Sequence, residues 1–231
     1  MKITALLPMK ANSDRIKQKN FRNFCGKPLF KWILDTLMSI DEIEKIVINT
    51  DAKKILYENG LVENKKILLR DRRKDICGDT VSMNKIIKDD LENLDSDLYL
   101  MTHTTNPLLS KKSIKNAINI FSSGLKSKEI DSLFSVNLVQ DRFFNLDAKP
   151  LNHDLNNLIR TQDLEPWYQE NSNLYLFTKE SFLTNDARIG KKPYMFVTPP
   201  FESVDIDNPH DWDLAEVMVD FLRKKGALNE L

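Results

Sequence analysis

Short apolar runs alternate with amphipathic helical segments along most of this chain. The first run covers residues 3–7, a helical pattern follows over residues 29–37, and the alternation continues to a terminal helix over residues 211–222. Short apolar runs bounded by polar turns are typical of strands that are buried on both faces of a sheet. Strands separated by helices form βαβ units with parallel pairing. The pattern therefore predicts an α/β domain with a mainly parallel sheet and helices on both faces.

The other expected elements keep this order. Further strands are expected over residues 45–51, 66–69, 98–101, 132–136, 173–177 and 195–197. Further helices are expected over residues 52–59, after Ser82 as a capping residue, and over residues 113–121. Between residues 138 and 171 the periodicity is weak and Asn, Asp and Pro are frequent. Such an insertion often serves as a lid or a subunit contact.

Composition limits the possible functions without choosing one. The 231 residues suit one large domain, and the 34 basic residues balance the 34 acidic ones. No global field therefore favours nucleic acid or a membrane, and an anion site has to be local. No signal peptide or apolar run of about 18 residues is present, so we expect a cytoplasmic protein. The two cysteines are too few for a disulfide framework or a zinc site and are expected to be buried thiols.

Residues 8–20 follow the first strand and are rich in cations and hydrogen-bond donors. They include Lys10, Asn12, Ser13, Arg15, Lys17, Lys19 and Asn20. The carboxyl ends of parallel strands are where α/β proteins bind their ligands. A nucleoside triphosphate has the matching negative charge. A solvated basic turn would have the same composition, so this loop alone leaves both interpretations open.

Two carboxylates stand two positions apart near the C-terminus. On a strand, Asp205 and Asp207 would point to one face while Ile206 faces the core. Two like charges on one face are costly unless a cation lies between them. Mg²⁺ suits this role because it binds through one or two carboxylates together with water and phosphate oxygens. The alternative is a strand end at which Asp207 or Asn208 caps a helix.

Several short motifs occur in an order that a known family shares. They are Pro8 to Asn20 followed by Gly26-Lys-Pro-Leu29, Asn49-Thr-Asp51, Arg72 to Asp79 with Ser82, His103 to Leu108, Arg160 to Tyr175, and Asp205-Ile-Asp207. They resemble P-A-R-x-x-S-x-x-x-x-x-K-N with G-K-P-L, S-T-D, R-P-x-x-L-a-x-D-x-x-S, Q-P-T-S-P-L, R-R-Q-x-L-P-P through N-G-x-I-Y, and D-I-D. These are motifs of the N-acylneuraminate cytidylyltransferases, also called CMP-sialic acid synthetases. The resemblance covers nearly the whole chain.

The resemblance implies a fold, a reaction and an assembly. The fold would be a three-layer Rossmann-like nucleotidyltransferase fold, one cytidylyltransferase domain over residues 1–231. Residues 138–188 would form an inserted subregion for dimerisation and for the sugar pocket. The reaction would be a Mg²⁺-dependent transfer of CMP from CTP to a sialic-type 3-deoxy-2-ulosonic acid, with release of pyrophosphate. The assembly would be a homodimer.

The resemblance also assigns roles to individual residues. The catalytic positions are Lys10, Lys19, Asp205 and Asp207, and the last two would hold Mg²⁺. The nucleotide-binding positions are Lys10, Ser13, Lys19, Asn20, Arg72 and Ser82. The sugar-binding positions are His103, Arg160, Gln162, Asn171 and Tyr175. Arg160 is expected to bind the carboxylate of the acid because a guanidinium can do so bidentately. A satisfied core amide and a packing aromatic are the alternatives for Asn171 and Tyr175.

The chain departs from the family pattern at a few positions. Lys10 replaces the usual arginine of the first loop and keeps the charge without the forked geometry. Ala11 and Asn12 stand where many relatives have glycines. His103 replaces a glutamine on the sugar side, which suggests a non-standard acceptor, and Thr161 interrupts the Arg-Arg pair.

Three other functions remain open at this point. A CMP-Kdo synthetase would share the fold and the chemistry, although its first two motifs usually form one unit. A nucleotidyltransferase for another base is disfavoured by the matches at Asn20 and Arg72. A non-catalytic nucleotide-binding homologue is disfavoured because Lys19 and both aspartates are retained.

Overall fold

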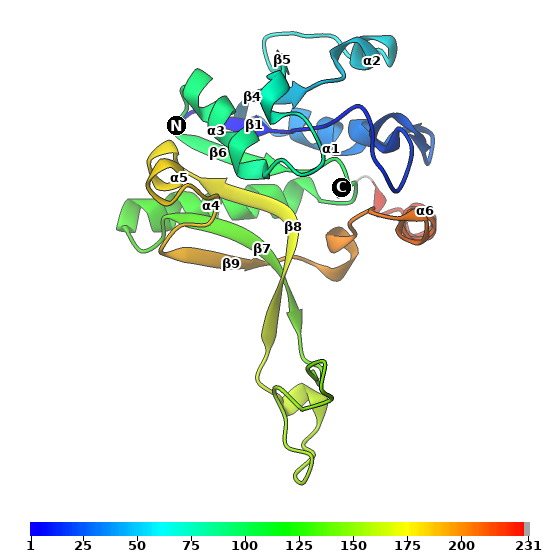
Figure 1. The fold of residues 1–231 in the computed structure, drawn as a ribbon, viewed down its shortest axis with the longest axis vertical. Helices are drawn as coiled ribbons and strands as arrows, with labels where there is room; N and C mark the ends of the chain where they lie inside the picture. The colour runs from blue at the N-terminus through cyan, green and yellow to red at the C-terminus, as the bar shows by residue number, and fades with distance from the viewer. Residues whose placement is uncertain (229–231) are drawn as a thin grey trace.

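A computed structural model describes residues 1–228 around a central seven-stranded sheet (Figure 1). The strand order is β5-β4-β1-β6-β8-β7-β9. Their bounds are β1 (Ile3–Leu6), β4 (Ile43–Thr50), β5 (Ile67–Asp71), β6 (Leu98–Thr102), β7 (Ser132–Val139), β8 (Trp167–Phe177) and β9 (Pro193–Val197). β8 is antiparallel to both of its neighbours, whereas the other neighbouring pairs are parallel. The predicted α/β class with a mainly parallel sheet is confirmed.

Helices cover both faces of the sheet. They are α1 (Leu29–Met38), α2 (Lys53–Glu58), α3 (Met83–Asn93), α4 (Lys111–Ser127), α5 (Lys179–Asn185) and α6 (Pro209–Lys224). Successive side chains of a strand face opposite sides. Ala5 of β1 therefore packs in a cluster with Phe30 of α1 and Phe121 of α4. Leu6 packs on the other face with Leu91 of α3. The three layers follow from this alternation.

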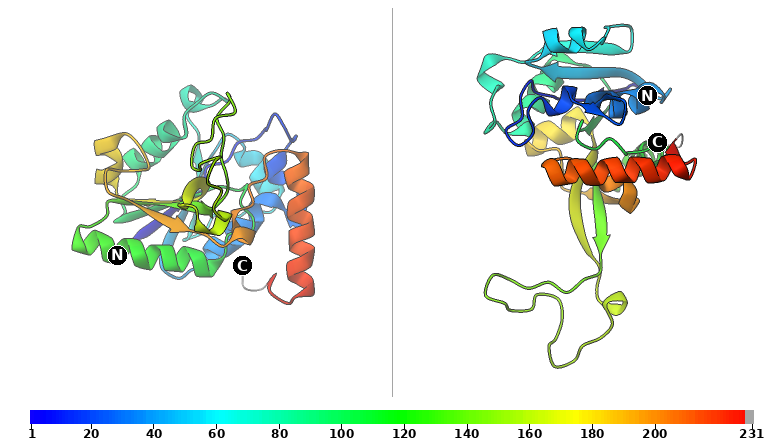
Figure 2. Two further views of the ribbon diagram at one scale, coloured as in Figure 1. Left: turned by 90° about the horizontal axis from the view of Figure 1, so that it is seen from below. Right: turned by 90° about the vertical axis from the view of Figure 1, so that its right-hand side faces the viewer.

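A third apolar cluster brings the two ends of the chain together. α6 packs against a short hairpin of β2 (Asn23–Phe24) and β3 (Lys27–Pro28), and it runs beside the N-terminal segment in the right panel of Figure 2. The rings of Phe24 and Trp212 meet edge to face at 5.2 Å. Ile16 of the basic loop and Ile206 are buried in the same cluster. Packing of these two isoleucines brings residues 8–20 close to the C-terminal aspartates.

A two-stranded arm projects from the body (Figures 1 and 2). We define the arm as residues 136–170, in which β7 and β8 pair from Val136 and Glu170 outward to Val139 and Trp167. Its tip is mostly irregular and includes a short 3-10 turn, Thr161–Asp163. The expected insertion over residues 138–188 is therefore only partly an arm, because the inner half of β8 and α5 belong to the body.

Several element boundaries differ from the expected ones. β8 begins at Trp167 rather than at residue 173, because its outer half pairs with β7 in the arm. α4 starts at Lys111 and ends at Ser127, so it is longer than expected at both ends. The short α5 and the β2–β3 hairpin were not expected. Cys25 and Cys77 are partly rather than fully buried, contrary to expectation.

The strand expected at Asp205 and Asp207 was a wrong prediction. A 3-10 turn, Pro200–Ser203, is followed by an extended segment that pairs with no strand. Its one backbone hydrogen bond to the neighbouring loop joins the Ile206 amide to the Thr105 carbonyl at 2.9 Å. Asn208 then caps α6, as the alternative interpretation allowed. No helix within residues 1–228 combines the length and apolarity of a membrane span.

Candidate functional site

A cavity of about 240 Å³ lies at the carboxyl ends of the parallel strands. It is lined by Lys10 after β1, Arg72 after β5 and His103 after β6. β1 lies between β4 and β6, so the chain first builds the sheet on one side of β1 and then returns to the other side. Such a switch point is where open α/β sheets bind ligands.

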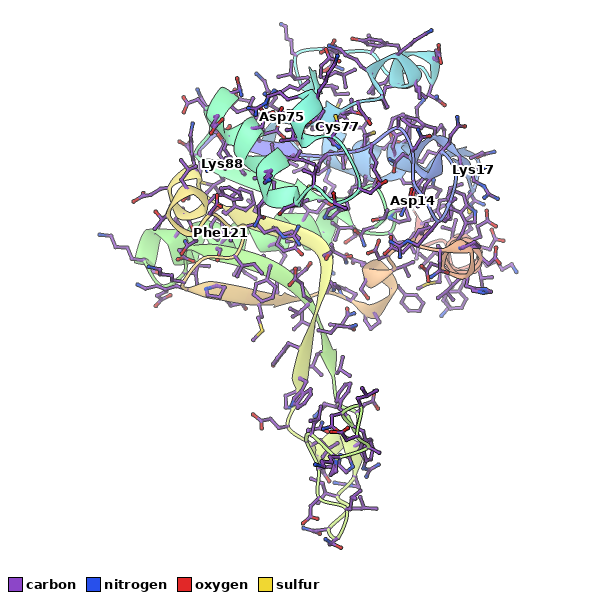
Figure 3. The ribbon with its side chains drawn as sticks, in the orientation of Figure 1. Asp14, Lys17, Asp75, Cys77, Lys88 and Phe121 are labelled. Carbon is purple, nitrogen blue, oxygen red and sulfur yellow. The ribbon has the colours of Figure 1, made fainter. Side chains whose placement is uncertain are left out.

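The structure brings many of the predicted residues together around this cavity. The predicted site residues that line it are Lys10, Ser13, Lys19, Asn20, Arg72, His103 and Asp207. Arg15 and Asp79 line it as well. Four of these lining side chains are cationic and two are anionic, so a chain without net charge has a locally positive cavity. Such a field attracts anionic ligands. Asp14 and Lys17 of the same loop are exposed and do not line it (Figure 3).

Lys19 and Asp207 bring the two ends of the chain into contact at this cavity. Lys19 is only 8% exposed, and its Nζ donates to the Ile206 carbonyl at 2.7 Å and to Asp207 Oδ1 at 3.2 Å. Arg15 Nη2 lies 3.1 Å from the other carboxylate oxygen, Oδ2. The carboxylate of Asp207 is thus held between two cations of the basic loop.

Arg72 is fixed by the ends of two neighbouring strands. Its Nη2 donates to the carbonyls of Met9 at 3.0 Å and Asn49 at 2.7 Å, and its Nε donates to Asn49 Oδ1 at 3.1 Å. Asn49 in turn donates to Asp90 Oδ1 at 2.8 Å. Burial raises the pKa of Asp90 to about 6, although Asn49 and Arg70 oppose the rise. This network orients the guanidinium of Arg72 at the cavity.

The basic loop is fastened at several points. The Ala11 amide donates to Asp51 Oδ1 at 2.7 Å, and Lys10 forms an ion pair with Asp79 that lowers the pKa of that carboxyl. Asn20 Nδ2 donates to the Lys10 carbonyl at 2.9 Å. Its Oδ1 accepts a hydrogen bond from the Thr104 hydroxyl at 2.6 Å. Asn20 therefore joins the loop after β1 to the loop after β6.

His103 is a neutral side chain in this positive environment. Burial lowers its pKa to about 4, and the charge of Arg188 adds to the effect. Asp207 opposes the shift, and Lys19 contributes to it. The imidazole can therefore donate one hydrogen bond and accept another at neutral pH.

Asp205 and Asp207, the expected ligands of a divalent cation, are placed differently: Asp207 lines the cavity and Asp205 does not. Oδ1 of Asp205 is buried and accepts no hydrogen bond from the described residues. Burial raises the pKa of Asp205, and the neighbouring charge of Asp207 raises it further. Residues 1–228 hold no cluster of three His, Cys, Asp or Glu side chains that would form a metal site alone. The pair fits Mg²⁺, which takes its remaining ligands from water and phosphate.

The other predicted residues lie outside the cavity. Ser82 caps α3 through the Asn84 amide at 3.3 Å, and its neighbours rather than its own side chain line the cavity. Arg160 and Gln162 are exposed on the arm, away from the cavity of their own chain (Figure 1). Arg160 pairs there with Asp163 at 2.7 Å.

Asn171 and Tyr175 have the structural environments that the alternative interpretation describes. Asn171 Nδ2 donates to Asn137 Oδ1 at 2.9 Å and to Thr198 Oγ1 at 2.7 Å, so its amide is satisfied in the core. Tyr175 is fully buried, and burial raises its pKa to about 12. Its hydroxyl donates to Glu170. Neither side chain lines the cavity.

Three side chains near the cavity were not among the predicted site residues. Arg15 and Asp79 line it, and they belong to the motifs Pro8 to Asn20 and Arg72 to Asp79. Their charge and their place in these motifs are sequence signals from which both residues could have been predicted to line the site. Arg188 lies beside Tyr175 in the connection between α5 and β9. It stands in no motif, and its position follows from its contacts with Tyr175 of β8 and Met101 of β6.

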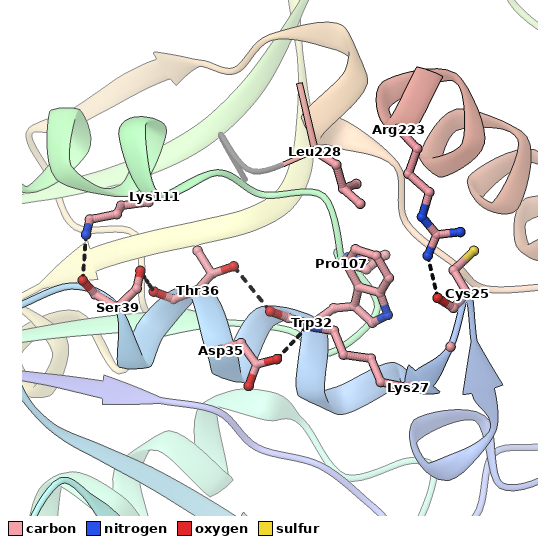
Figure 4. Close-up of a pocket in the computed structure, with 11 residues that line it drawn as sticks. Cys25, Lys27, Trp32, Asp35, Thr36, Ser39, Pro107, Lys111, Arg223 and Leu228 are labelled. Atoms are coloured by element: carbon pink, nitrogen blue, oxygen red, sulfur yellow. Dashed lines mark hydrogen bonds and ion pairs between the residues drawn. The ribbon is translucent and has the colours of Figure 1, made fainter. Parts of the chain in front are cut away.

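A second cavity, of about 600 Å³, contains none of the predicted site residues (Figure 4). It lies between α1 and the C-terminal end of α6 and is lined by residues such as Trp32, Lys111 and Arg223. Arg223 Nη2 donates to the Cys25 carbonyl there at 2.6 Å. Its size alone does not make it the site, because the predicted anion-binding residues converge on the smaller cavity.

Comparison with known proteins identifies similar sequences and folds. A family model described as Cytidylyltransferase matches residues 4–219. The CMP-N,N'-diacetyllegionaminic acid synthase of Legionella pneumophila is 27% identical, and the match covers 95% of this chain and 97% of that protein. The pseudaminic acid cytidylyltransferase of Campylobacter jejuni is 25% identical, with 94% and 96% covered.

The fold is also shared with solved structures. A CMP:2-keto-3-deoxy-manno-octonic acid synthetase complexed with CTP matches with a TM-score of 0.66 at 10% identity, covering 97% of this chain and 100% of that one. The nucleotidyltransferase fold expected from the sequence resemblance is thereby confirmed.

Proposed function

Because this chain belongs to the cytidylyltransferase family, we propose that it transfers CMP from CTP to a sialic-type nonulosonic acid. In this reaction the anomeric hydroxyl of the acid loses its proton and attacks the α-phosphorus, and pyrophosphate leaves with the electrons of the broken P–O bond. The observation that carries the proposal is the contact of Lys19 with Asp207 in a positive cavity at the carboxyl ends of the strands.

The basic loop is suited to hold the triphosphate. Lys10 and Lys19 present ammonium groups to the cavity, and Ser13 can donate a hydroxyl hydrogen bond. Charge builds on the leaving pyrophosphate during the reaction, and fixed cations stabilise that charge in a site that excludes bulk water. Asn20 and Arg72 are the expected contacts of the cytidine. Arg72 is already oriented by its three hydrogen bonds to Met9 and Asn49.

Asp205 and Asp207 would hold Mg²⁺ against the phosphates. The unpartnered buried oxygen of Asp205 supports this assignment. When bound there, Mg²⁺ would offset phosphate charge and polarise the phosphorus. In the structure Lys19 and Arg15 neutralise Asp207 instead. These cations would be available to the phosphates once a divalent ion takes over the carboxylate.

The acceptor would bind on the side of His103. A neutral imidazole can exchange both a donated and an accepted hydrogen bond with sugar hydroxyls. The similar proteins are named for legionaminic and pseudaminic acids, which supports a nonulosonic acid as the class of acceptor. The identity of the acid depends on contacts near His103, where the chain departs from the family pattern.

The arm suits contact with a second copy of the chain. Apolar side chains of the arm are exposed, among them Leu146, Leu151, Leu155 and Leu158. Several exposed apolar side chains on one projecting arm favour an interaction site there. In a homodimer the arm would cover the partner's body and would bring Arg160 and Gln162 towards the neighbouring sugar pocket.

Pyrophosphate release from CTP tests the proposed function. The panel of acceptors contains N-acetylneuraminate, its deaminated form, legionaminate, pseudaminate and Kdo, each with Mg²⁺. We expect turnover with a nine-carbon acid. Turnover with Kdo alone would favour the second candidate, which the shared fold of the CMP-Kdo synthetase supports. CTP binding without turnover of any acid would contradict an enzymatic role.

A further inference from the structure

Arg188 does not line the cavity, but its charge acts on His103, which does, and the sequence resemblance gives Arg188 no role. Its Cζ lies 3.9 Å from the centre of the Tyr175 ring, and its Nη2 lies 3.4 Å from Glu170 Oε1. Its Nη1 approaches the sulfur of Met101 at 4.0 Å. Met101 is the register partner of Tyr175, so these two side chains share one face of the sheet, and His103 follows two positions after Met101, just beyond the end of β6. Arg188 therefore belongs to the acceptor side of the site.

The backbone after Arg188 holds it in this place. The amide of Gly190 donates to the Ser132 hydroxyl at 2.8 Å, and the amide of Lys191 donates to Asp131 Oδ2 at 2.9 Å. A Cβ atom on Gly190 would lie 2.3 Å from Asp131 Oδ1, so the close approach requires a glycine. This anchor sets the path of the chain two residues beyond Arg188.

The guanidinium of Arg188 keeps hydrogen-bonding capacity for a ligand. It has five N–H donors, and its hydrogen bonds within residues 1–228 are those to Met101 and Glu170. The side chain is 22% exposed, so it is accessible yet largely desolvated. Its charge is felt at His103, where it helps to lower the pKa of the imidazole. Lys19, the other cation that acts on His103, is already bound to Asp207.

Arg160, the expected partner of the acid's carboxylate, is placed differently. Its side chain is 73% exposed on the arm, and Asp163 occupies its guanidinium. It can reach a sugar pocket only in a second copy of the chain. Arg188 lies in the body of its own chain, where it stacks on the ring of Tyr175 and its pair with Glu170 is longer, at 3.4 Å, than that of Arg160 with Asp163.

We propose that Arg188 binds the carboxylate of the acceptor acid within its own protomer, while the ring of Tyr175 supports the guanidinium. The assignment rests on the proposed function, which supplies the anionic acceptor. A guanidinium binds a carboxylate through two parallel hydrogen bonds. Arg188 thereby selects acids over neutral sugars.

Steady-state kinetics of Arg188→Ala and Arg188→Lys test this assignment, with the acid that the wild-type protein turns over best. We expect Arg188→Ala to raise KM for the acid about 10- to 100-fold, since hydrogen bonds to charged groups are worth factors of this size. KM for CTP should stay unchanged. The KM of Arg188→Lys for the acid should lie between those of wild type and Arg188→Ala. Lys191→Ala, an exposed cation in the same connection, is the matched control and should behave as wild type.

The methyl ester of the same acid separates carboxylate binding from a merely structural role. As a competing ligand, the ester should bind wild type and Arg188→Ala equally, because the group that Arg188 recognises is masked. If Arg188→Ala weakens acid and ester by the same factor, Arg188 only supports the fold of the site and the assignment is refuted. An unchanged KM for the acid, or a loss confined to Arg160→Ala, refutes it as well.

Wild-type turnover distinguishes the failure of this assignment from the failure of the proposed function. If the wild-type protein turns over no acid, the proposed function is wrong and the role of Arg188 falls with it. If wild type is active and Arg188→Ala keeps its KM for the acid, only the assignment is wrong.

Discussion

Lys19 and Asp207 lie 188 positions apart in the sequence, yet Lys19 Nζ is 3.2 Å from Asp207 Oδ1. The contact depends on apolar packing behind it, because Ile16 and Ile206 are buried in one cluster with Trp212 of α6. Full burial of an isoleucine contributes about 1.5–3 kcal/mol. Burial of Ile16 and Ile206 therefore stabilises the arrangement that places Lys19 and Asp207 at one cavity.

Asp207→Ala should lower kcat by about 100-fold or more, because the carboxylate is expected to hold the metal that stabilises phosphate charge. The fold should survive, since the side chain is partly exposed. Circular dichroism and thermal melting would verify the fold, and pyrophosphate release would give the rate. Asp213→Ala removes an exposed carboxylate from α6, the helix that follows Asp207, and is the matched control. A variant at position 207 with most of the wild-type rate would remove the metal from this account.

The parts of the site that depend on local sequence patterns could be predicted, and the parts that depend on contacts between distant segments could not. The strands that precede Lys10, Arg72 and His103 are local patterns of apolar residues, and the basic loop is a contiguous segment. Their meeting point follows from the parallel sheet. Arg188 could not be found in this way, because its place depends on the pairing of Met101 with Tyr175 across two strands.

The boundaries that were mispredicted have physical reasons of the same kind. The outer half of β8 is exposed, and its strand structure is set by pairing with β7 in the arm rather than by burial. Asp205 and Asp207 show the alternation of a strand, but the segment meets a loop at Thr105 instead of a strand edge. Periodicity reports which side chains are buried, and it does not report whether a backbone partner is present.

His103→Gln should change the preference among acceptor acids while the affinity for CTP stays the same. The imidazole lies after β6 on the acceptor side, and glutamine has a different length and a different arrangement of donor and acceptor. Competition between two acids for the same enzyme would measure the preference, and calorimetric titration would measure CTP binding. A matched loss of affinity for CTP and acid would place His103 at the nucleotide instead.

His103 should also make the folded protein less stable as the pH falls. Its pKa is about 4 in the folded state against an ordinary value of 6.5, so the unfolded chain binds more protons between these values. Stability from this group therefore rises with pH across that window and is constant above it. His103→Gln should remove this contribution, on the order of 1–3 kcal/mol over the window. Denaturant unfolding of wild type and His103→Gln at pH 4.5, 5.5 and 7 would show whether the stability difference between them changes with pH. A stability difference between the two proteins that does not change with pH would contradict an imidazole that stays neutral in the folded state.

Leu155→Asp together with Leu158→Asp should convert a dimer into a monomer, because charges would replace exposed apolar contacts at the tip of the arm. Light scattering after size-exclusion chromatography would give the mass of each form. Val62→Asp changes a residue that is 70% exposed outside the arm and should leave the mass unchanged. A wild-type monomer, or a dimer that survives both arm substitutions, would show that the arm has another role.

The position of a bound metal and nucleotide tests the central claim most directly. Crystals of the protein with CTP and Mn²⁺, a divalent ion visible by anomalous scattering, would locate both. We predict an anomalous peak beside Asp205 and Asp207, with the triphosphate between that ion and the ammonium groups of Lys10 and Lys19. A nucleotide bound elsewhere, for example in the cavity beside Trp32, or an ion away from both aspartates, would contradict the account.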